Sequence, residues 1–321
     1  MNILLTGCAG FIASKVGELL LKTNNKVFGI DNLNDAYDVR LKEWRLQQLT
    51  QYKNFKFFKS DIVNLNEIEP LFKSHNINAI INLAARAGVR YSVENPWVYM
   101  DTNIIGTLNL LELCRKYNIK KFVLASTSSI YGETGLPFIE DKKTDCPLSP
   151  YAASKKGAEA ICYTYHYLYG IDISIPRYFT VYGPAGRPDM SYFIFTKKIK
   201  AGEEITIYGD GNQERDFTYI DDIAAGTVAA LKSVGYQIIN LGNNHPVKLN
   251  YMINLIEDSL HKKAKINYLP RHPADVTATW ANISKAKKTL SWSPKIDIED
   301  GIQKTVNWFE ENWEWVKEIK I

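Results

Sequence analysis

Short apolar runs rich in β-branched and aromatic residues recur along the first half of the chain, separated by longer amphipathic stretches. Because these runs are apolar throughout, we expect strands buried on both faces, and the stretches between them predict helices. The alternation predicts an α/β fold, a doubly wound parallel sheet of the Rossmann type. The strands are expected at residues 2–6, 26–30, 55–59, 79–83, 121–125 and 172–176.

Two long helices are expected among these strands. Residues 96–117 have an amphipathic pattern. The tyrosines of ICYTYHYLYG alternate as in a strand, but Ser149 is placed as an N-cap, Pro150 in the first turn and Gly170 as a stop. We therefore predict one helix over 149–169, whose tyrosines pack in the core or at a subunit interface.

The regular pattern ends after residue 177, where Pro184, Gly186 and Pro188 indicate a loop region. A smaller, discontinuous C-terminal substrate domain is expected beyond it, and the stretch 308–318 predicts an amphipathic terminal helix. The expected boundaries are 1–177, with returns near 216–245, for the dinucleotide-binding domain, and 178–215 with 246–321 for the substrate domain.

Composition narrows the class of protein. The chain has 321 residues, of which 45% are hydrophobic and 23% charged, as in an ordinary soluble globular protein. Its net charge of +4 suits an anionic small molecule, and the absence of clustered lysine and arginine argues against a nucleic-acid surface. Five histidines without ligand spacing predict no metal site.

The compartment is expected to be the cytoplasm. The four cysteines form no C-x-x-C pair, which predicts reduced thiols in a reducing compartment. The chain starts directly with a predicted strand, so we expect no signal peptide. No apolar run approaches the roughly 20 residues that span a bilayer.

The stretch TGCAGFIAS follows the first predicted strand and opens a helix. Gly7 permits a tight turn, and Gly10 lets the backbone approach a pyrophosphate at the helix N-terminus. Ala13 stands where a third glycine is usual, and alanine is a recognised variant there. A tight structural turn would explain this loop equally well if it stood alone.

Acidic residues at the next two strand ends strengthen the prediction. Asp31 ends the second strand, where a carboxylate binds the ribose hydroxyls of NAD and repels the 2′-phosphate of NADP. No arginine adjoins Asp31 to offset this repulsion, so we predict NAD as the cofactor. We also expect the NAD to be tightly bound. Asp61 and Ile62 follow the third strand and are placed to meet the adenine, although Asp61 could be a plain surface residue.

Tyr151 and Lys155 lie four residues apart and hence on one face of the predicted helix. A tyrosine with a pKa of about 10 is a poor base, and ionising it near pH 7 costs roughly 4 kcal/mol. Lys155 and a positively charged nicotinamide would both favour the phenolate, and Lys155 can also hold the nicotinamide ribose. A solvated helix face is the structural alternative.

Several motifs together make the chain resemble the extended short-chain dehydrogenase/reductase family along its full length: TGCAGFIAS, STSSIYG and YAASK. The longer motifs are similar to those of nucleotide-sugar epimerases, most closely the UDP-glucuronate 4-epimerases: GIDNLNDAYDVRLK, AGVRYSVENP, RYFTVYGPAGRPDM and GDGNQERDFTYIDDI. The resemblance implies that Thr127 hydrogen-bonds the sugar O4 beside Tyr151, giving Thr127, Tyr151 and Lys155 as the catalytic set.

The resemblance and the positions of charges also imply two sets of ligand contacts. The cofactor-binding set is Gly7, Gly10, Phe11, Ile12, Asp31, Asn32, Asn34, Asp61, Ile62, Leu83, Ala84, Ala85, Asn103, Tyr151, Lys155 and Tyr178. The substrate-binding set is Arg90, Thr127, Ser128, Ser129, Tyr151, Thr180, Arg187, Tyr208, Arg215, Arg271 and Asp275. Two departures leave the sugar open: Arg86 stands where the family commonly has glutamine, and His272 where glutamine or methionine is usual.

The residues after Thr127 separate three possible fates of a 4-keto sugar. Related dehydratases carry an Asp-Glu pair there, and related decarboxylases carry a glutamate two places beyond the threonine. Here the positions hold Ser128 and Ser129, which cannot act as acids of matched pKa. This favours epimerisation. If the substrate is UDP-glucuronate, as the resemblance implies, the hydroxyls of Thr127, Ser128, Ser129 and Thr180 could hold its carboxylate. Hydroxyls that cap strand-end backbone groups are the alternative.

Other functions stay open. A UDP-galactose/UDP-glucose 4-epimerase usually has asparagine at the position of Thr180, and a UDP-glucuronate decarboxylase lacks support at Ser129. A non-catalytic NAD-sensing regulator commonly loses the tyrosine or the lysine, and both are present here. The helices at 96–117 and 149–169 could pair across a two-fold axis, so we predict a homodimer.

Overall fold

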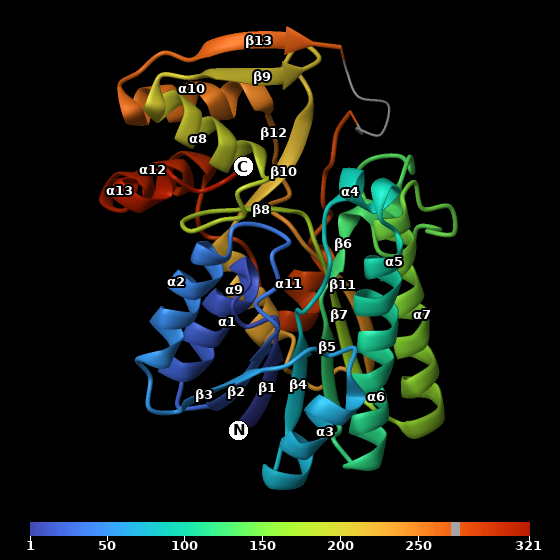
Figure 1. Cartoon of the computed structure of the whole chain (residues 1–321). Coiled ribbons are helices and arrows are strands. Elements are labelled where there is room, and N and C mark those ends of the chain that lie inside the picture. The colour runs from blue at the N-terminus through green and yellow to red at the C-terminus, as the bar shows by residue number, and fades with distance from the viewer. Residues whose placement is uncertain (271–276) are drawn as a thin grey trace.

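The computed structural model describes residues 1–270 and 277–321 (Figure 1). Arg271, His272 and Asp275, which the sequence placed near the ligand, lie outside the described residues.

A parallel sheet forms the centre of the molecule, in the order β11-β7-β5-β4-β1-β2-β3, with a short strand β6 paired to β7 (Figure 1). All of its pairings are parallel, and the order matches the doubly wound dinucleotide-binding fold. Every predicted strand is present, so the predicted fold class is confirmed. The strands are β1 (Asn2–Thr6), β2 (Lys26–Asp31), β3 (Phe55–Lys59), β4 (Ala79–Asn82), β5 (Lys121–Leu124), β6 (Ser126–Thr127), β7 (Asp172–Tyr178) and β11 (Tyr236–Leu241).

Helices cover both faces of the sheet, which is why its strands are apolar throughout. In β1, Ile3 and Leu5 belong to one hydrophobic core and Leu4 to the other. Figure 1 shows α1, α2 and α9 on one side and α3, α6 and α7 on the other. Their bounds are α1 (Phe11–Lys22), α2 (Val39–Thr50), α9 (Ile220–Ala229), α3 (Leu65–Ser74), α6 (Gly106–Lys116) and α7 (Pro150–Tyr169). In the described part of the chain, no helix is long and apolar enough to cross a bilayer.

The helix predicted from Ser149, Pro150 and Gly170 is confirmed as α7. The Ser149 hydroxyl accepts a hydrogen bond from the Ala152 N–H, and Gly170 ends the helix in the left-handed region at φ 64°. The helix predicted over 96–117 is also present, but it is not uniform. A π-helical segment separates α5 from α6; the three pieces are α5 (Trp97–Tyr99), η1 (Met100–Ile105) and α6.

Most of the remaining elements gather beyond the carboxyl edge of the sheet, whereas α11 (Ser284–Leu290) packs against β11 and α9 (Figure 1). They include the parallel pair β9 and β13 and a small three-stranded sheet, β12-β10-β8. The strands are β8 (Thr180–Tyr182), β9 (Glu204–Tyr208), β10 (Glu214–Tyr219), β12 (Pro246–Lys248) and β13 (Lys265–Leu269). The helices are α4 (Val89–Glu94), α8 (Ser191–Ala201), α10 (Leu249–Leu260), α12 (Ile298–Glu311) and α13 (Trp313–Val316).

The prediction of one terminal helix over 308–318 is wrong, because the helix breaks at Asn312 between α12 and α13. The Asn312 side chain donates to the Trp308 carbonyl oxygen at 2.9 Å and accepts from Trp315 Nε1 at 3.2 Å. An asparagine that bonds the local backbone in this way competes with the helical pattern. The chain turns there, and Trp308 and Trp315 pack together with Trp44 of α2.

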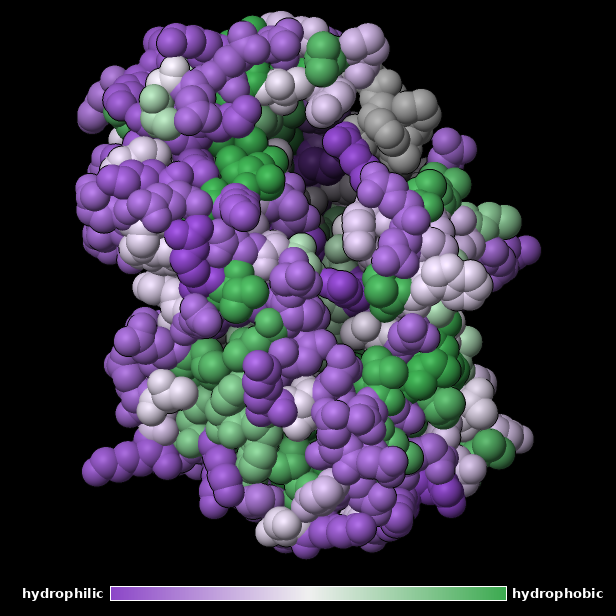
Figure 2. Space-filling view, in the orientation of Figure 1, coloured by the Kyte–Doolittle hydropathy of each residue, from purple (hydrophilic) through white to green (hydrophobic). Residues whose placement is uncertain are grey.

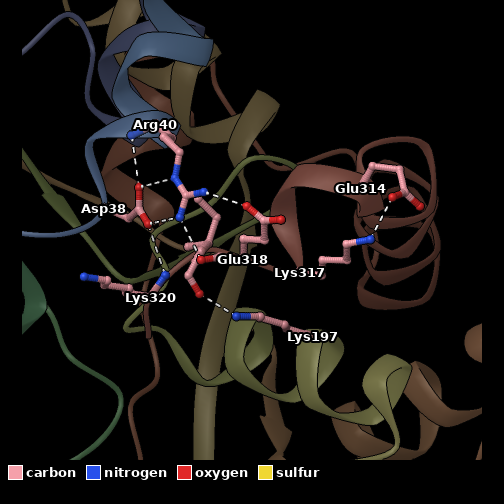
Figure 3. Close-up of polar contacts among 8 residues, drawn as sticks. Asp38, Arg40, Lys197, Glu314, Lys317, Glu318 and Lys320 are labelled. Carbon is pink, nitrogen blue, oxygen red and sulfur yellow. Dashed lines mark hydrogen bonds and ion pairs between the residues drawn. The ribbon is translucent and has the colours of Figure 1, made fainter.

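The C-terminal segment is tied to the start of α2 by polar contacts (Figure 3). Arg40 donates to the Asp38 carboxylate and to the Glu318 carbonyl oxygen, both at 2.7 Å. Asp38 also accepts from the Lys320 N–H at 3.1 Å, and the Arg40 guanidinium lowers the pKa of Asp38 to about 2. These contacts join the last residues of the chain to the loop that follows β2.

Candidate active site

The glycine loop leaves β1 and passes into α1 with little room to spare. Gly7 has a φ of 68°, and a Cβ there would lie 2.8 Å from the backbone of Ala84. The Gly10 N–H donates to the Gly7 carbonyl oxygen at 2.7 Å, and the buried Ala13 replaces the usual third glycine without disturbing α1. No side chain caps the start of α1. The backbone N–H groups of Phe11 and its neighbours therefore form a site that favours an anion.

Asp31 is fixed beside this loop. Its two carboxylate oxygens accept the N–H groups of Ala9 at 3.1 Å and Leu33 at 2.8 Å, and its side chain is buried. Each oxygen keeps a lone pair that a ribose hydroxyl could use. The Asn32 amide donates to Asp61 at 2.7 Å, which joins the loops after β2 and β3.

Asp61 is therefore not a plain surface residue, because its other oxygen accepts the Val63 N–H at 2.9 Å. The Ile62 side chain does not point toward an adenine site, although the sequence had suggested that it would. It is buried against α6, so close that a Cβ on Gly106 would lie 2.5 Å from Ile62 Cδ1. The Ile62 carbonyl oxygen accepts a hydrogen bond from the Asn109 amide at 3.0 Å, which leaves the backbone N–H of Ile62 for a ligand.

The loop after β4 runs along the other side of the glycine loop. Thr6 Oγ1 accepts the Ala84 N–H at 3.1 Å, while Leu83 is half-buried and Ala85 is exposed. Asn103, in the π-helical segment, accepts the Arg86 N–H at 2.9 Å and donates to the Arg86 carbonyl oxygen at 3.0 Å. π-Helical turns are frequent at functional sites.

Asn103 also donates to Ser154 Oγ at 2.9 Å. Ser154 lies on α7 between Tyr151 and Lys155, so the Asn103 amide connects the loop after β4 to the helix that carries this pair. The amide is occupied by protein groups. The position of Asn103 thus supports the site rather than presenting a free group to a cofactor.

Tyr151 and Thr127 are brought together. Tyr151 is half-buried and packs edge-on against Tyr99, with ring centroids 6.0 Å apart. Burial raises the pKa of Tyr151, while its hydrogen bond with Thr127 and the charge of Arg187 act in the opposite direction. The tyrosine therefore needs further positive charge nearby before it can act as a base at neutral pH.

Lys155 is 3% exposed, and burial lowers the pKa of its ammonium to about 8, although Glu159 opposes the shift. Among the described residues, none accepts a hydrogen bond from the Lys155 ammonium. A buried charge without a partner is costly. Lys155 therefore fits a ligand that brings hydroxyl acceptors, such as a nicotinamide ribose.

The hydroxyls after β5 have separate roles. The Thr127 hydroxyl accepts the Ser129 N–H at 3.1 Å, so it does cap the short turn that follows, as the structural alternative expected. It also donates to Ser129 Oγ at 3.2 Å. Ser126 turns away and donates to Glu159 at 2.6 Å, while Ser128 is half-buried and has no hydrogen-bond partner for its hydroxyl in the described chain.

Glu159 is a buried carboxylate one helical turn beyond Lys155, and the sequence analysis did not single it out. Arg177 of β7 donates to both of its oxygens, at 3.0 and 2.8 Å. With the Ser126 bond, this pair fixes α7 against the strand ends that carry Thr127. The spacing Lys155 to Glu159 was the available signal, since it puts both on one helix face.

Two further residues were missed, Lys42 and Arg45 of α2, which are 5% and 2% exposed. Arg45 donates to the carbonyl oxygens of Ala9, Ala185 and Gly186. In the described residues, no carboxylate forms an ion pair with Lys42, Arg45, Arg86 or Lys155.

Buried cations in proteins are normally paired. Lys42 and Arg45 are buried and Arg86 is half-buried near the glycine loop, and none has a carboxylate partner among the described residues, so together they fit an anionic ligand such as a dinucleotide diphosphate. No arginine adjoins Asp31 in the sequence, but the structure brings Lys42 close enough for their charges to interact. The available signal was a buried stripe at helical spacing that contains two cations: Leu41, Lys42, Arg45 and Leu49.

The substrate-side residues lie among the elements beyond the sheet edge. The Arg90 guanidinium lies 4.8 Å from the centre of the Tyr208 ring, so α4 meets the end of β9 there. Arg187 pairs with Asp189 and approaches the Ala87 carbonyl oxygen at 3.5 Å. Figure 2 shows the surface hollowed between these elements and the sheet.

Three other residues that were predicted to contact a ligand are Thr180, Arg215 and Tyr178. Thr180 is half-buried at the start of β8. Arg215 of β10 donates to the carbonyl oxygens of Glu214 at 2.9 Å and Thr277 at 3.4 Å. The Tyr178 hydroxyl shares a 2.8 Å hydrogen bond with Thr227 of α9, so it points into the protein core.

Comparisons with known proteins agree with this geometry. The family model described as GDP-mannose 4,6 dehydratase matches residues 4–305. A UDP-glucuronate 4-epimerase of Thermodesulfobacterium geofontis (strain OPF15) is 60% identical over 319 residues, which cover 99% of each chain. The crystal structure of a Bacillus cereus UDP-glucuronic acid 4-epimerase in complex with UDP-glucuronic acid and NAD is 39% identical, with a TM-score of 0.91 over 97% of this chain and 100% of that one.

A dTDP-glucose 4,6-dehydratase from Bacillus anthracis str. Ames in complex with NAD is also similar. It is 31% identical, with a TM-score of 0.88, and the match covers 100% of both chains. The same fold therefore serves epimerases and dehydratases. The fold alone does not distinguish the two reactions.

Proposed function

Since the chain belongs to the GDP-mannose 4,6-dehydratase family of extended short-chain dehydrogenases/reductases, we propose that it is an NAD-dependent UDP-glucuronate 4-epimerase. It converts UDP-glucuronate to UDP-galacturonate by inverting C4 of the sugar. The 60% identical relative carries this activity in its name, and the similar Bacillus cereus enzyme was crystallised with both UDP-glucuronic acid and NAD.

One observation carries the choice among the family's reactions: hydroxyls, not carboxylates, follow Thr127. A dehydratase or a decarboxylase needs a proton donor or acceptor close to C5 or C6 of the sugar. Here Ser128 and Ser129 fill those positions, and the nearby carboxylate of Glu159 is occupied by Arg177 and Ser126.

NAD fits the unpaired cations and the glycine loop, and when bound it supplies the acceptor and later the donor of the C4 hydride. The chain's own groups manage the proton. Tyr151 removes the proton from O4, and Thr127 holds O4 beside it. Lys155 favours the phenolate through its positive charge and holds the ribose. The 4-keto sugar rotates about its diphosphate link, and Tyr151 returns the proton to O4 after the opposite face has reacted.

The substrate carboxylate needs protection during this step, because a 4-keto uronic acid is a β-keto acid that readily loses CO₂. Ser128, Ser129 and Thr180 are neutral donors that can hold the carboxylate without protonating it. They keep the C5–C6 bond out of alignment with the ketone π-system. The Ser128 hydroxyl, which has no hydrogen-bond partner among the described residues, suits this role.

Positive side chains anchor the nucleotide while the sugar rotates. Arg187, Arg215 and Arg90 offer charge to the diphosphate or sugar, and Tyr208 lies beside the uracil. Arg271 and Asp275, outside the described residues, stay predicted contacts of the diphosphate and the uridine ribose.

A direct experiment is to incubate the purified protein with UDP-glucuronate, UDP-galactose or UDP-glucose, without added NAD, and to resolve the products. The proposal predicts UDP-galacturonate from UDP-glucuronate and no UDP-pentose. Interconversion of UDP-galactose and UDP-glucose alone would instead favour a UDP-galactose/UDP-glucose 4-epimerase. Such an enzyme usually has asparagine at the position of Thr180. Absence of turnover with all three would favour the NAD-sensing regulator.

The quaternary structure and compartment are proposed on separate grounds. Apolar side chains are exposed on α7, including Tyr163 at 53% and Tyr167 at 76%, and Figure 2 shows apolar surface over the region of α6 and α7. A two-fold pairing of these helices would cover it, giving a homodimer. Light scattering of the purified protein tests the dimer.

The proposed compartment is the cytoplasm, because the thiols of all four cysteines are free.

A further inference from the structure

A side-chain hydrogen bond joins the two loops that flank the glycine loop. In the sheet, β1 lies between β4 and β2, so the glycine loop after β1 is flanked by the loops after those strands. Arg86 follows β4 and Asn34 follows β2, yet Arg86 Nη1 donates to Asn34 Oδ1 at 3.4 Å. The bond therefore connects the two loops on either side of the loop on which a dinucleotide diphosphate would rest.

The backbones of both bonded residues are held in place. The backbone N–H and carbonyl of Arg86 are bonded by Asn103, which is itself tied to α7. On the other side, the Asn34 N–H and side-chain amide both donate to Asn32 Oδ1, at 3.1 and 2.8 Å. Only the long Arg86 side chain is free to move.

The hydrogen bond between Arg86 and Asn34 brings two positive charges together, and no carboxylate among the described residues forms an ion pair with either of them. The Lys42 ammonium donates to the same Asn34 oxygen at 2.9 Å, so two cations share one neutral acceptor. Burial lowers the pKa of Lys42; Asp31 opposes the change, and the charges of Arg86 and Arg45 add to it. Like charges in such a place repel, and a phosphate between them would turn the repulsion into attraction.

We propose that Arg86 and Asn34 form a latch across the bound dinucleotide, which slows the release of the cofactor between turnovers. The proposal rests on NAD as the cofactor of the proposed function, but not on which sugar is converted. Because an epimerase ends each turnover with its cofactor in the starting state, slow release lets one cofactor molecule serve many turnovers.

The test measures the rate at which the purified holoenzyme loses NAD, without any sugar present. The protein is diluted into alcohol dehydrogenase and ethanol, which reduce each released NAD and report it by absorbance at 340 nm. We expect Arg86→Gln and Asn34→Ala each to speed release about tenfold, the effect of losing a hydrogen bond to a charged group. Arg115→Gln, on the exposed face of α6, is the matched control and should leave the rate unchanged.

The double variant Arg86→Gln/Asn34→Ala separates a latch from two independent contacts. A latch predicts that the double variant releases NAD no faster than Asn34→Ala alone, because Asn34→Ala already breaks the bond to Arg86 together with the bond to Lys42. Rates equal to that of the unaltered protein, or effects that multiply in the double variant, would overturn the proposal. Arg86→Gln keeps both backbone bonds to Asn103, so the variant should fold. Because the readout needs no sugar, a failed epimerase assay would not affect it.

Discussion

Replacing Lys155 by methionine tests whether the buried ammonium that the reaction needs lowers the stability of the folded protein. The Lys155 ammonium is buried, and its pKa falls from the ordinary 10.5 to about 8. The difference of about 2.5, at about 1.36 kcal/mol per pKa unit, corresponds to about 3 kcal/mol. That free energy is the cost of burying the charged group at neutral pH in the cofactor-free protein.

Methionine fills similar space without a charge, so we expect cofactor-free Lys155→Met to be about 3 kcal/mol more stable than the unaltered protein at pH 7. The folded-state pKa lies below the unfolded value, so the folded protein loses its proton first as the pH rises. The unaltered protein therefore gains stability between about pH 8 and 10.5. The advantage of the variant is full below pH 8 and shrinks toward zero near pH 10.5.

Urea unfolding of both cofactor-free proteins at pH 7 and pH 10 measures this difference. Lys156→Met is the control on the same helix. Its ammonium donates to Thr144 Oγ1 at 2.7 Å, so this change should cost up to about 1 kcal/mol. Epimerase turnover of Lys155→Met should fall by about a thousandfold. The reasoning fails if Lys155→Met is no more stable at pH 7, or if its advantage is the same at both pH values.

Three other substitutions have defined outcomes. Tyr151→Phe removes the group that takes the O4 proton, so turnover should fall about a thousandfold or more with bound NAD unchanged; product formation at a normal rate would refute its role. Ser128→Ala/Ser129→Ala should release CO₂ and UDP-pentose from UDP-glucuronate, and product analysis without CO₂ would count against carboxylate holding. Asn103→Ala leaves half-buried backbone groups of Arg86 unpaired, so it should lower the free energy of unfolding by about 2 kcal/mol, and an unchanged urea midpoint would show that these groups find other partners.

Local patterns explain why the strands and α7 could be predicted. A strand buried on both faces leaves a short apolar run, and a helix with Ser149 at its start and Gly170 at its end carries its boundaries in the sequence. The π-helical segment around Asn103 has no such signature, because it depends on packing against α7. The break at Asn312 was hidden by an apolar pattern that runs through both terminal helices.

Some residues of the site could likewise be predicted from the sequence, and others could not. Gly7 and Asp31 could be predicted because the fold fixes their distances along the chain. Arg45 could not, because its partners lie in the glycine loop and in residues 185–186, far from it in sequence. The inward-facing hydroxyl of Tyr178 likewise depends on Thr227 of a later helix.

The most direct measurement uses UDP-glucuronate deuterated at C4, incubated with the purified protein in ordinary water without added NAD. If Tyr151 and the cofactor oxidise C4 and restore it within one active site, the UDP-galacturonate that forms will keep its deuterium at C4. Product that has lost the deuterium, UDP-pentose with CO₂, or no product at all would contradict the proposed epimerisation.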